Sequence, residues 1–258
     1  MAILQKTDSC SVVYFALSWI VAFMIAGETA NAQTKQPTFV ELFTSQGCSS
    51  CPPADALLGE LVKRKDVIAV TLPVDYWDYL GWKDTLASPA NTKRQYAYAK
   101  ARRDRQVYTP QMVLNGQHHV VGNRRSQVFG KIDELSKAEK APNIKVNISS
   151  LKDAITVKTG TPPSKLAGEQ ATLWLIMFKK KVTIPIKRGE NRGHTISYYN
   201  VARQMLPLGK WTGKPMKVTL PKAELIAQGY DGCIALLQVN NGGRVLGVAA
   251  LNDLSTTN

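Results

Sequence analysis

Residues 38–53 read TFVELFTSQGCSSCPP and set the plan of the first half of the chain. The stretch begins with an apolar, β-prone run that ends in Gly47, which favours a strand. Two cysteines three positions apart, Cys48 and Cys51, follow it, and the prolines and residues 54–61 after them predict a helix. Strand, Cys-x-x-Cys and helix form the arrangement of a dithiol redox centre, because unpaired N–H groups at a helix N-terminus favour a thiolate. We therefore assign both cysteines as candidate catalytic residues.

The segment before this strand is typical of a secretory signal peptide. It has a charged start at Lys6, an apolar run over residues 12–26 and the ending Ala30-Asn31-Ala32. The apolar run is shorter than the roughly 20 residues that span a bilayer, which favours cleavage over a retained anchor. We place cleavage after Ala32, so residues 1–32 form the leader and the mature chain is expected in the periplasm or outside the cell.

The composition narrows the class of partner. The chain has 258 residues and a net charge of +14, so it favours acidic partners such as membrane surfaces, anionic polysaccharide or acidic proteins. The lysines and arginines are spread along the chain without a nucleic-acid motif, and an exported protein is not expected to bind nucleic acid. A solvated basic surface is the simpler alternative.

Cys10 lies in the leader, and the one other cysteine of the mature chain and the histidines do not complete a local metal motif. Cys233 begins an apolar strand and is expected to be buried in the core. A zinc site normally needs a second cysteine pair or histidines at ligand spacing, and His118, His119 and His194 are not spaced from the cysteines in that way. We assign no cofactor and no metal; a metal site would need ligands that the fold brings together.

Independent support for the redox interpretation lies at residues 107–116, VYTPQMVLNG. A Thr109-Pro110 pair opens an apolar strand, Asn115-Gly116 predicts a hairpin turn, and a second strand follows at 118–121. The order of strand, Cys-x-x-Cys, helix, strand, helix, Thr-Pro, hairpin and helix resembles the thioredoxin fold. The resemblance implies that Pro110 is cis and faces the dithiol. It also implies that Thr109 presents its backbone to a substrate peptide.

Three further elements complete this part of the chain. We expect a buried strand at 66–72, a helix from Ser88-Pro89 through Arg105 and a closing helix from Arg125 to about Lys140. Their inward-facing residues are expected to be Tyr96, Ala97, Ala99 and Ala101 in the first helix and Val128, Phe129, Ile132 and Leu135 in the second.

The loop at 73–84 holds four aromatic residues and three carboxylates. One interpretation is a lip over the dithiol that contacts substrate, with Tyr76 and Trp77 as substrate-binding residues. The alternative is an aromatic plug that covers the edge of the core, because aromatic residues with polar tips suit both roles.

Taken together, these segments resemble a narrower group. Residues 41–55, 74–82 and 108–111 look like an uncharacterised family of exported bacterial thioredoxin-like proteins, and the likeness continues through 188–193 and 199–203. It covers nearly the whole mature chain. It implies a thioredoxin-like domain followed by a β-rich one, and it supplies no established substrate or activity.

The chain departs from thioredoxin at residues that tune the dithiol. Ser49 and Ser50 lie between the cysteines, and neither is a histidine that would stabilise the thiolate. Leu42 stands six positions before Cys48, where thioredoxin has a buried aspartate, and Glu41 is expected on the other face of the strand. The direction of electron flow therefore stays open.

From about residue 142 the pattern becomes that of short strands with regular turns, which indicates a sandwich-like module. Strands are expected at 144–148, 155–157, 171–178, 182–186, 216–220, 234–239 and 244–251. Within this part Arg188, Asn191 and Arg192 form a candidate loop for a partner or an anion, since guanidinium groups match carboxylates and phosphates. The alternative is an ordinary hairpin loop with solvated charges.

These observations predict an α/β thioredoxin-like domain at residues 33–141 followed by an all-β, sandwich-like domain at residues 142–258. The expected function is thiol–disulfide exchange with thiols or disulfides of envelope proteins through Cys48 and Cys51. Two alternatives stay open. One is a periplasmic metal-handling protein, for example for copper, with the cysteines as soft ligands. The other is a non-catalytic binding module in which the cysteines form a structural disulfide.

Overall fold

The computed structural model describes residue 2 and residues 36–137, 143–166, 168–240 and 242–255. The expected leader and its cleavage site lie outside the described residues, apart from Ala2. The end of the closing helix expected at Lys140 also lies outside them. Within the described ranges, no helix combines the length and the apolar character that a membrane span requires.

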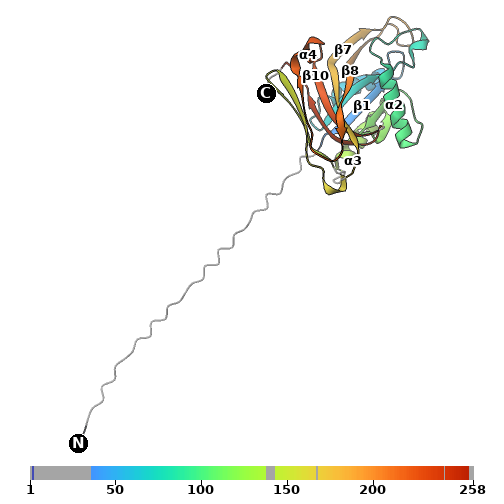
Figure 1. Ribbon diagram of the computed structural model, residues 1–258. Helices are drawn as coiled ribbons and strands as arrows, with labels where there is room; N and C mark the ends of the chain where they lie inside the picture. Colours follow the sequence, from blue (N-terminus) through green and yellow to red (C-terminus); the bar gives the residue numbers. More distant parts are fainter. Residues whose placement is uncertain (1, 3–35, 138–142, 167, 241, 256–258) are drawn as a thin grey trace. The chain divides into compact units, whose positions relative to one another are not determined.

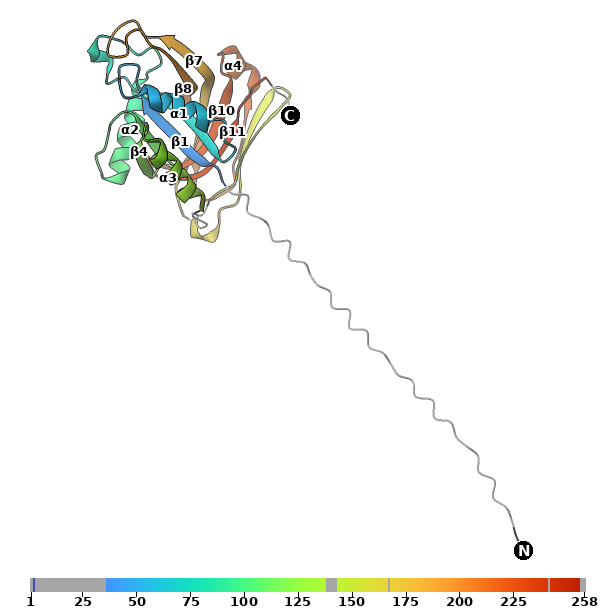
Figure 2. The same cartoon turned by 180° about the vertical axis from the view of Figure 1, so that it is seen from behind.

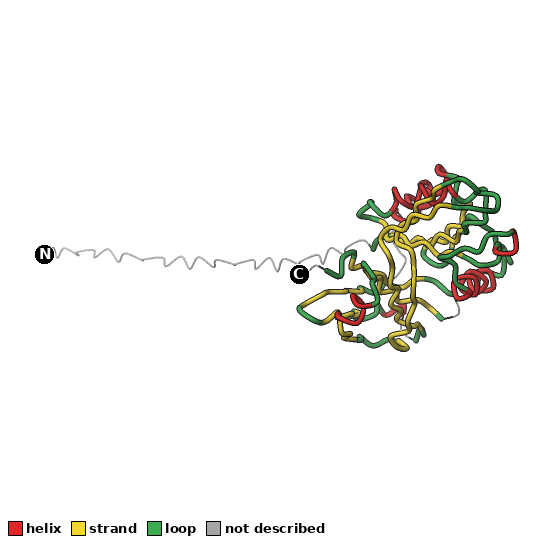
Figure 3. The backbone as a smooth tube through the Cα atoms, turned by 90° about the horizontal axis from the view of Figure 1, so that it is seen from above, coloured by secondary structure: helices red, strands yellow, loops and turns green. Residues whose placement is uncertain are grey.

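Strands make up most of the regular structure (Figures 1 and 3). An eight-stranded mixed sheet has the order β11-β10-β7-β8-β2-β1-β3-β4, and a three-stranded sheet has the order β5-β6-β9. The strands of the large sheet are β1 (Thr38–Thr44), β2 (Val67–Pro73), β3 (Gln111–Leu114), β4 (His118–Val121), β7 (Ala171–Pro185), β8 (Thr195–Trp211), β10 (Gly232–Val239) and β11 (Val245–Leu251). Those of the small sheet are β5 (Val146–Leu151), β6 (Ala154–Thr159) and β9 (Lys217–Pro221).

Helices cover both faces of the large sheet around β1. They are α1 (Pro52–Leu61), α2 (Pro89–Arg102) and α3 (Arg125–Lys137). A short helix, α4 (Lys222–Ala227), contacts β6 of the small sheet instead, and 3-10 turns lie at Asp78–Leu80 and Ser164–Leu166. Because side chains alternate along a strand, Val40 and Leu42 pack with α1 and α3. Phe39 and Phe43 point to the opposite face, where they pack with Tyr98 of α2. Figure 1 shows the α2 side, and Figure 2, from behind, shows α1 and α3 in front of β1.

The expectation of an α/β thioredoxin-like domain followed by an all-β, sandwich-like domain is wrong. The molecule is mostly β, and strands from both halves of the chain form one sheet, in which β8 pairs in parallel with β2. The junction has one backbone pair, Thr71 with Val201, and the hydroxyl of Thr71 donates to the carbonyl of Tyr199 at 2.7 Å. The amide of Asn200 donates to the carbonyl of Ala69 at 3.0 Å. The domain boundary placed between residues 141 and 142 stays a prediction.

Two expectations for the strands of the second half are wrong. No strand is expected from the sequence at the residues of β8, which has 17 residues. The strands expected at 171–178 and 182–186 are one element, β7, which pairs with β8 from Ala171 to Pro185. The hairpin at Asn115-Gly116 is confirmed, with both residues at positive φ (49° and 72°) between β3 and β4.

The prediction of which α2 residues face inward is wrong at most positions. The buried residues are Asn91, Gln95, Tyr98 and Ala99, whereas Tyr96 is 55% exposed. The helix also ends earlier than expected, at Arg102, because Arg103 adopts a left-handed conformation with φ of 62°. The side chain of Ser88 accepts a hydrogen bond from the N–H of Ala90, as expected of a residue that caps the helix start. In α3 Val128 and Ile132 are buried, as expected.

A buried ion pair ties β1 to α2 and β10. Glu41 is fully buried on the face opposite Leu42, as expected, and its Oε1 accepts from Nε of Arg94 at 2.6 Å. The hydroxyl of Tyr98 donates to the other oxygen of Glu41. Arg94 also donates to Oε1 of Gln238 at 2.9 Å, and the amide of Gln238 donates to the Tyr98 hydroxyl at 2.9 Å. Residues from distant parts of the chain therefore share one hydrogen-bonded network.

Replacing Arg94 with alanine should lower the free energy of unfolding by about 3–5 kcal/mol, because Glu41 would be left buried without its counter-charge. Urea denaturation measures the loss. Lys93, the exposed neighbour on α2, provides the matched control: Lys93→Ala should change the free energy of unfolding by less than about 0.5 kcal/mol. Similar losses in the two variants would contradict a structural role for the ion pair.

Candidate functional site

The two cysteines of the motif form a disulfide at the start of α1. Cys51 is the capping residue of the helix and donates its N–H to the carbonyl of Cys48 at 3.1 Å. Pro52 and Pro53 occupy the first helical positions, where an N–H has no intrahelical partner and proline is tolerated. Both cysteines are buried: Cys48 is 3% exposed and Cys51 is fully enclosed.

Pro110 lies beside the first turn of this helix. The Thr109–Pro110 bond is cis, as the resemblance implied. Gly122 donates its N–H to the carbonyl of Pro110 at 2.8 Å, and a Cβ atom added to Gly122 would lie 3.3 Å from Pro110 and 3.2 Å from Ala54. The amide of Asn123 also donates to the carbonyl of Ser50 at 3.2 Å. The start of the β3–β4 hairpin is thereby fixed against the dithiol loop.

Trp77 joins the two sides of the site. Its Nε1 donates to the hydroxyl of Thr109 at 2.7 Å, and a Cβ atom added to Gly47 would lie 3.1 Å from the Cβ of Trp77. The ring of Tyr76 lies 6.0 Å from that of Trp77 between centroids. Burial raises the pKa of Tyr76 to about 12, with the Gln95 amide and the Thr109 hydroxyl acting against the rise. The structure therefore brings the four predicted substrate-binding residues together.

The aromatic loop at residues 73–84 also holds the backbone segment just before Cys48 in place. Gln46 is fully buried; its N–H donates to the carboxylate of Asp84 at 2.8 Å, and its side-chain oxygen accepts from Nε1 of Trp82 at 2.8 Å. Asp84 accepts further hydrogen bonds from the N–H groups of Leu86 and Ala87. The sequence located the loop, but it gave no local indication that Gln46 and Asp84 would be bonded to each other.

The connection between β7 and β8, Ile186–His194, covers the dithiol from the other side. Asn191 is 4% exposed, and its amide donates to the carbonyls of Gln46 and Cys48, each at 2.9 Å. Glu190 accepts from the N–H of Ser49 at 3.3 Å. Arg188 and Arg192 are exposed. Of the predicted anion loop, one member therefore lies at the dithiol and the two arginines point to solvent.

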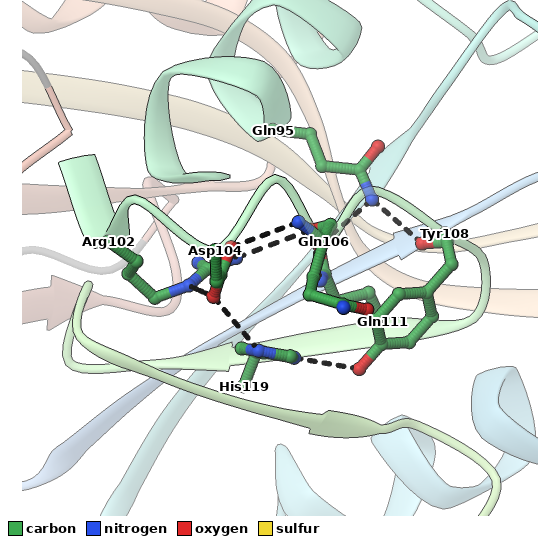
Figure 4. A network of polar contacts seen from close by, with 7 residues as sticks. All are labelled: Gln95, Arg102, Asp104, Gln106, Tyr108, Gln111 and His119. Atoms are coloured by element: carbon green, nitrogen blue, oxygen red, sulfur yellow. Dashed lines mark hydrogen bonds and ion pairs between the residues drawn. The ribbon is translucent and has the colours of Figure 1, made fainter. Parts of the chain in front are cut away.

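A polar network supports the segment that leads to Thr109 (Figure 4). The hydroxyl of Tyr108 bonds to Nδ1 of His119 at 2.8 Å, and Nε2 of His119 lies 3.1 Å from the carboxylate of Asp104. Gln95 of α2 donates to the carbonyl of Tyr108 at 2.8 Å, and Nε of Arg102 donates to Asp104 at 2.7 Å. Burial lowers the pKa of His119, assisted by Arg102 and opposed by Asp104. The network fixes the backbone next to Thr109.

Two of the three histidines considered as metal ligands, His119 and His194, contact other side chains or backbone groups. His119 belongs to the network of Figure 4, and Nδ1 of His194 lies 3.2 Å from the carbonyl of Asn191. The part of the chain that the structure describes holds no group of three or more histidine, cysteine or acidic side chains arranged to bind a metal ion. Cys233 is buried in the core, as expected, and burial raises the pKa of its thiol to about 12.

One buried carboxylic acid near the dithiol was missed. Asp55 is 1% exposed on the inner face of α1, and neither of its oxygens has a hydrogen bond of normal length and angle from a described residue, although the Thr44 hydroxyl lies close enough to act on the carboxyl group. Burial raises its pKa well above the usual range; the Thr44 hydroxyl opposes this shift and Asp84 adds to it. The sequence placed Asp55 in the predicted helix, but its burial depends on residues far away in the chain.

The family model described as "Protein of unknown function (DUF1223)" matches residues 39–238. The chain belongs to this family. The expectation of an uncharacterised family is confirmed, while its thioredoxin-like and exported character stay predictions.

Two solved structures are similar to the chain. One is the crystal structure of a protein from Agrobacterium tumefaciens, whose sequence is 34% identical to this chain. The match has a TM-score of 0.75 and covers 88% of this chain and 99% of the other. HBP35 of Porphyromonas gingivalis is 13% identical, with a TM-score of 0.58, over 86% of this chain and 77% of that one, a likeness of fold alone. No protein with a curated description matches the chain.

Replacing Asn191 with alanine should make the Cys48–Cys51 disulfide roughly tenfold more reactive toward dithiothreitol. The substitution removes two hydrogen bonds that hold the β7–β8 connection on the dithiol loop, each worth about 0.5–1.5 kcal/mol. Alkylation of the released thiols at successive times measures the rate. Arg192→Ala, which changes an exposed side chain of the same connection, should leave the rate unchanged. Equal rates in all three proteins would show that the connection does not restrict access.

Proposed function

We propose that the protein exchanges disulfides with proteins of the cell envelope through Cys48 and Cys51. The proposal rests on one observation: the disulfide lies at the N-terminus of α1, and Thr109, Pro110 and Trp77 are held around the loop that carries it. The N–H groups at the start of a helix stabilise a thiolate at this place. The neighbouring backbone of Thr109 offers hydrogen-bonding groups to a peptide that carries the reacting sulfur.

The exchange needs no other reactant than substrate thiols. A substrate thiolate attacks Sγ of Cys48, the bond between Cys48 and Cys51 breaks, and Cys51 takes the electron pair as a thiolate. A second substrate thiolate attacks the substrate sulfur of the mixed disulfide and releases Cys48. The substrate is oxidised to a disulfide by two electrons, and the protein dithiol is reduced. The reverse sequence reduces a substrate disulfide, with Cys48 as nucleophile and Cys51 as the resolving thiol.

Compartment and partner are part of the same proposal. The expected signal peptide places the mature protein in the periplasm or outside the cell, where disulfides persist. The unit formed by β1, α1 and the Thr109-Pro110 segment supports kinship of this site with those of thioredoxin-like exchange proteins. The segment before Thr109 contributes to a surface pocket. The pocket is lined by Tyr96, Ala99, Lys100, Arg103, Arg105 and Val107. Its three cationic side chains suit an acidic partner or an anionic membrane surface.

The burial of both cysteines favours a second candidate, a binding module that the disulfide merely stabilises. A fully enclosed disulfide is protected from attack, as structural disulfides are, unless the β7–β8 connection moves. The two candidates differ in one measurable quantity, the reduction potential of the pair.

The reduction potential of Cys48–Cys51 should lie between about −120 and −270 mV, the range of exchange catalysts. It is measured on the mature protein by alkylation after equilibration in glutathione or dithiothreitol buffers. The position within the range distinguishes an oxidant from a reductant. A potential below about −300 mV, where structural disulfides lie, would exclude exchange catalysis and support the binding module.

Replacing Cys51 with alanine should accumulate mixed disulfides between Cys48 and envelope proteins, because the resolving thiol is absent. The variant is expressed with its leader in an export-competent bacterial cell, and adducts are detected by non-reducing electrophoresis and mass spectrometry. The double variant Cys48→Ala, Cys51→Ala should form none of them, and Cys233→Ser in the Cys51→Ala background should retain them, since Cys233 is buried. Absence of adducts from the single variant would count against exchange with proteins.

A further inference from the structure

Three buried polar side chains lie near one another at the first turns of α1, and none of them makes a hydrogen bond of normal length and angle with a described residue. They are Thr44 at the end of β1, Asp55 on α1 and Tyr198 on β8. Asp55 is 1% exposed, Tyr198 is 1% exposed and Thr44 is fully buried. A buried polar group without a partner destabilises a fold, so each such group calls for an explanation. Of the three side chains, that of Asp55 has the lowest pKa in water. It also lies on α1, the helix that begins at the dithiol.

Helix geometry places Asp55 against Cys51. Cys51 has helical dihedral angles, φ of −79° and ψ of −36°, and its carbonyl accepts the N–H of Asp55 at 3.1 Å. Residues four apart on a helix lie on one face with Cβ atoms about 5–6 Å apart. Both side chains are buried, and so both point away from solvent on that face. The Asp55 oxygens make no hydrogen bond to Sγ of Cys51, and at this separation of the Cβ atoms one water molecule can carry a proton between the carboxyl group and Sγ.

The surroundings of Asp55 favour its neutral form. Two titratable groups interact electrostatically with Asp55: Asp84, in the loop before α2, and Tyr198, on β8. The hydroxyl of Thr44, at the end of β1, lowers the pKa of Asp55. Burial raises the pKa of Tyr198, and Asp55 and Asp84 add to the rise, so this phenol stays neutral. Burial also raises the pKa of Asp84, against the N–H groups of Gln46 and Leu86. With the disulfide closed, the Asp55 carboxyl therefore holds its proton well above the pH at which a free aspartate loses it.

We propose that Asp55 donates a proton to Cys51 when the disulfide opens and accepts it back when the disulfide closes. The inference rests on the proposed exchange function. On opening, a substrate thiolate bonds to Sγ of Cys48, the Cys48–Cys51 bond breaks, and the leaving Cys51 thiolate takes the proton of the Asp55 carboxyl. On closing, the Asp55 carboxylate takes the proton from the Cys51 thiol, which attacks Sγ of Cys48 and expels the substrate thiolate. Charge and electrons balance in both directions.

The contacts of this side chain contribute little to the stability of the fold. A carboxyl group without a hydrogen bond of normal geometry carries a burial cost that an apolar residue of similar size avoids, and the nearby Thr44 hydroxyl offsets only part of it. Glu41 shows the contrast, because its two oxygens are bonded by Arg94 and Tyr98.

The test compares the wild-type mature protein with Asp55→Asn, which keeps the shape of the side chain and removes the transferable proton. The rate of disulfide opening by dithiothreitol is measured from pH 5 to pH 9 by quenching with an alkylating reagent and mass spectrometry. We expect Asp55→Asn to slow opening at neutral pH by at least roughly tenfold, within the range of general acid–base effects, and to lose the inflection that titration of the carboxyl gives the wild-type profile. Tyr198→Phe, which removes the neighbouring hydroxyl, should keep the inflection.

The outcomes separate the inference from the function on which it rests. If the wild-type disulfide does not exchange, the proposed function fails. If the wild type exchanges and Asp55→Asn follows the same rates and the same pH profile, only the role of Asp55 is overturned.

Urea unfolding checks the folding of the variant. Because the pKa of Asp55 is higher in the folded chain, the wild type loses stability as the pH rises from the unfolded value, near 3.9, through the folded one. Asp55→Asn should therefore be at least as stable as the wild type at neutral pH, and a clear loss there would overturn the premise.

Discussion

The pairing of β8 with β2 is the constraint on which the rest of the structure depends. One backbone pair and two side-chain hydrogen bonds join strands that are far apart in the sequence. Because β7 is bound to β8 along its whole length, this junction places the end of the β7–β8 hairpin over Cys48. Together with the contacts of Gln238 on β10 to Arg94 and Tyr98, the junction fixes the second half of the chain on the first and brings Asn191 to the dithiol loop.

The two faces of β1 give carboxyl groups two different environments. On one face of β1, Glu41 is bonded by Arg94 and Tyr98, so its charge is compensated and its position is fixed. On the other face Tyr198 of β8 and Asp84 enclose Asp55 without donating to it. A carboxylate that is paired with a cation holds strands and helices together. A buried carboxyl group without a counter-charge changes its protonation state with small changes in its surroundings. The structure therefore separates a group suited to stability from one suited to proton transfer.

Sequence reasoning succeeded where the signal is local. An apolar run, a Cys-x-x-Cys motif followed by prolines and an Asn-Gly turn each act over a few residues, and they correctly located β1, α1 and the β3–β4 hairpin. It failed where structure depends on distant partners. The strand β8 carries polar residues such as Ser197, Asn200 and Gln204 in its run, and its strand state comes from pairing with β7. The inward face of α2 was misread because Asn91 and Gln95 are buried through hydrogen bonds to backbone carbonyls.

The candidate site divides in the same way. Cys48, Cys51, Thr109 and Pro110 carry recognisable spacing or a recognisable dipeptide, and the structure brings them together. The contributions of Asn191 and Asp55 arise from tertiary packing, and the residues themselves are common in loops and helices. Their types gave no indication of burial, and only the fold shows that both lie at the dithiol.

The cover over the dithiol is held by polar contacts, and this determines how it can open. Asn191 and Glu190 make three hydrogen bonds to the dithiol loop, each with a net value of about 0.5–1.5 kcal/mol because water replaces it when it breaks. Below the cover, α1 packs on β1 through fully buried residues such as Leu42 and Leu58, whose separation would expose apolar surface. Movement of the connection therefore costs much less than movement of the helix. We therefore expect access to Cys48 to depend on movement of the β7–β8 connection, with α1 and its buried carboxyl group keeping their geometry.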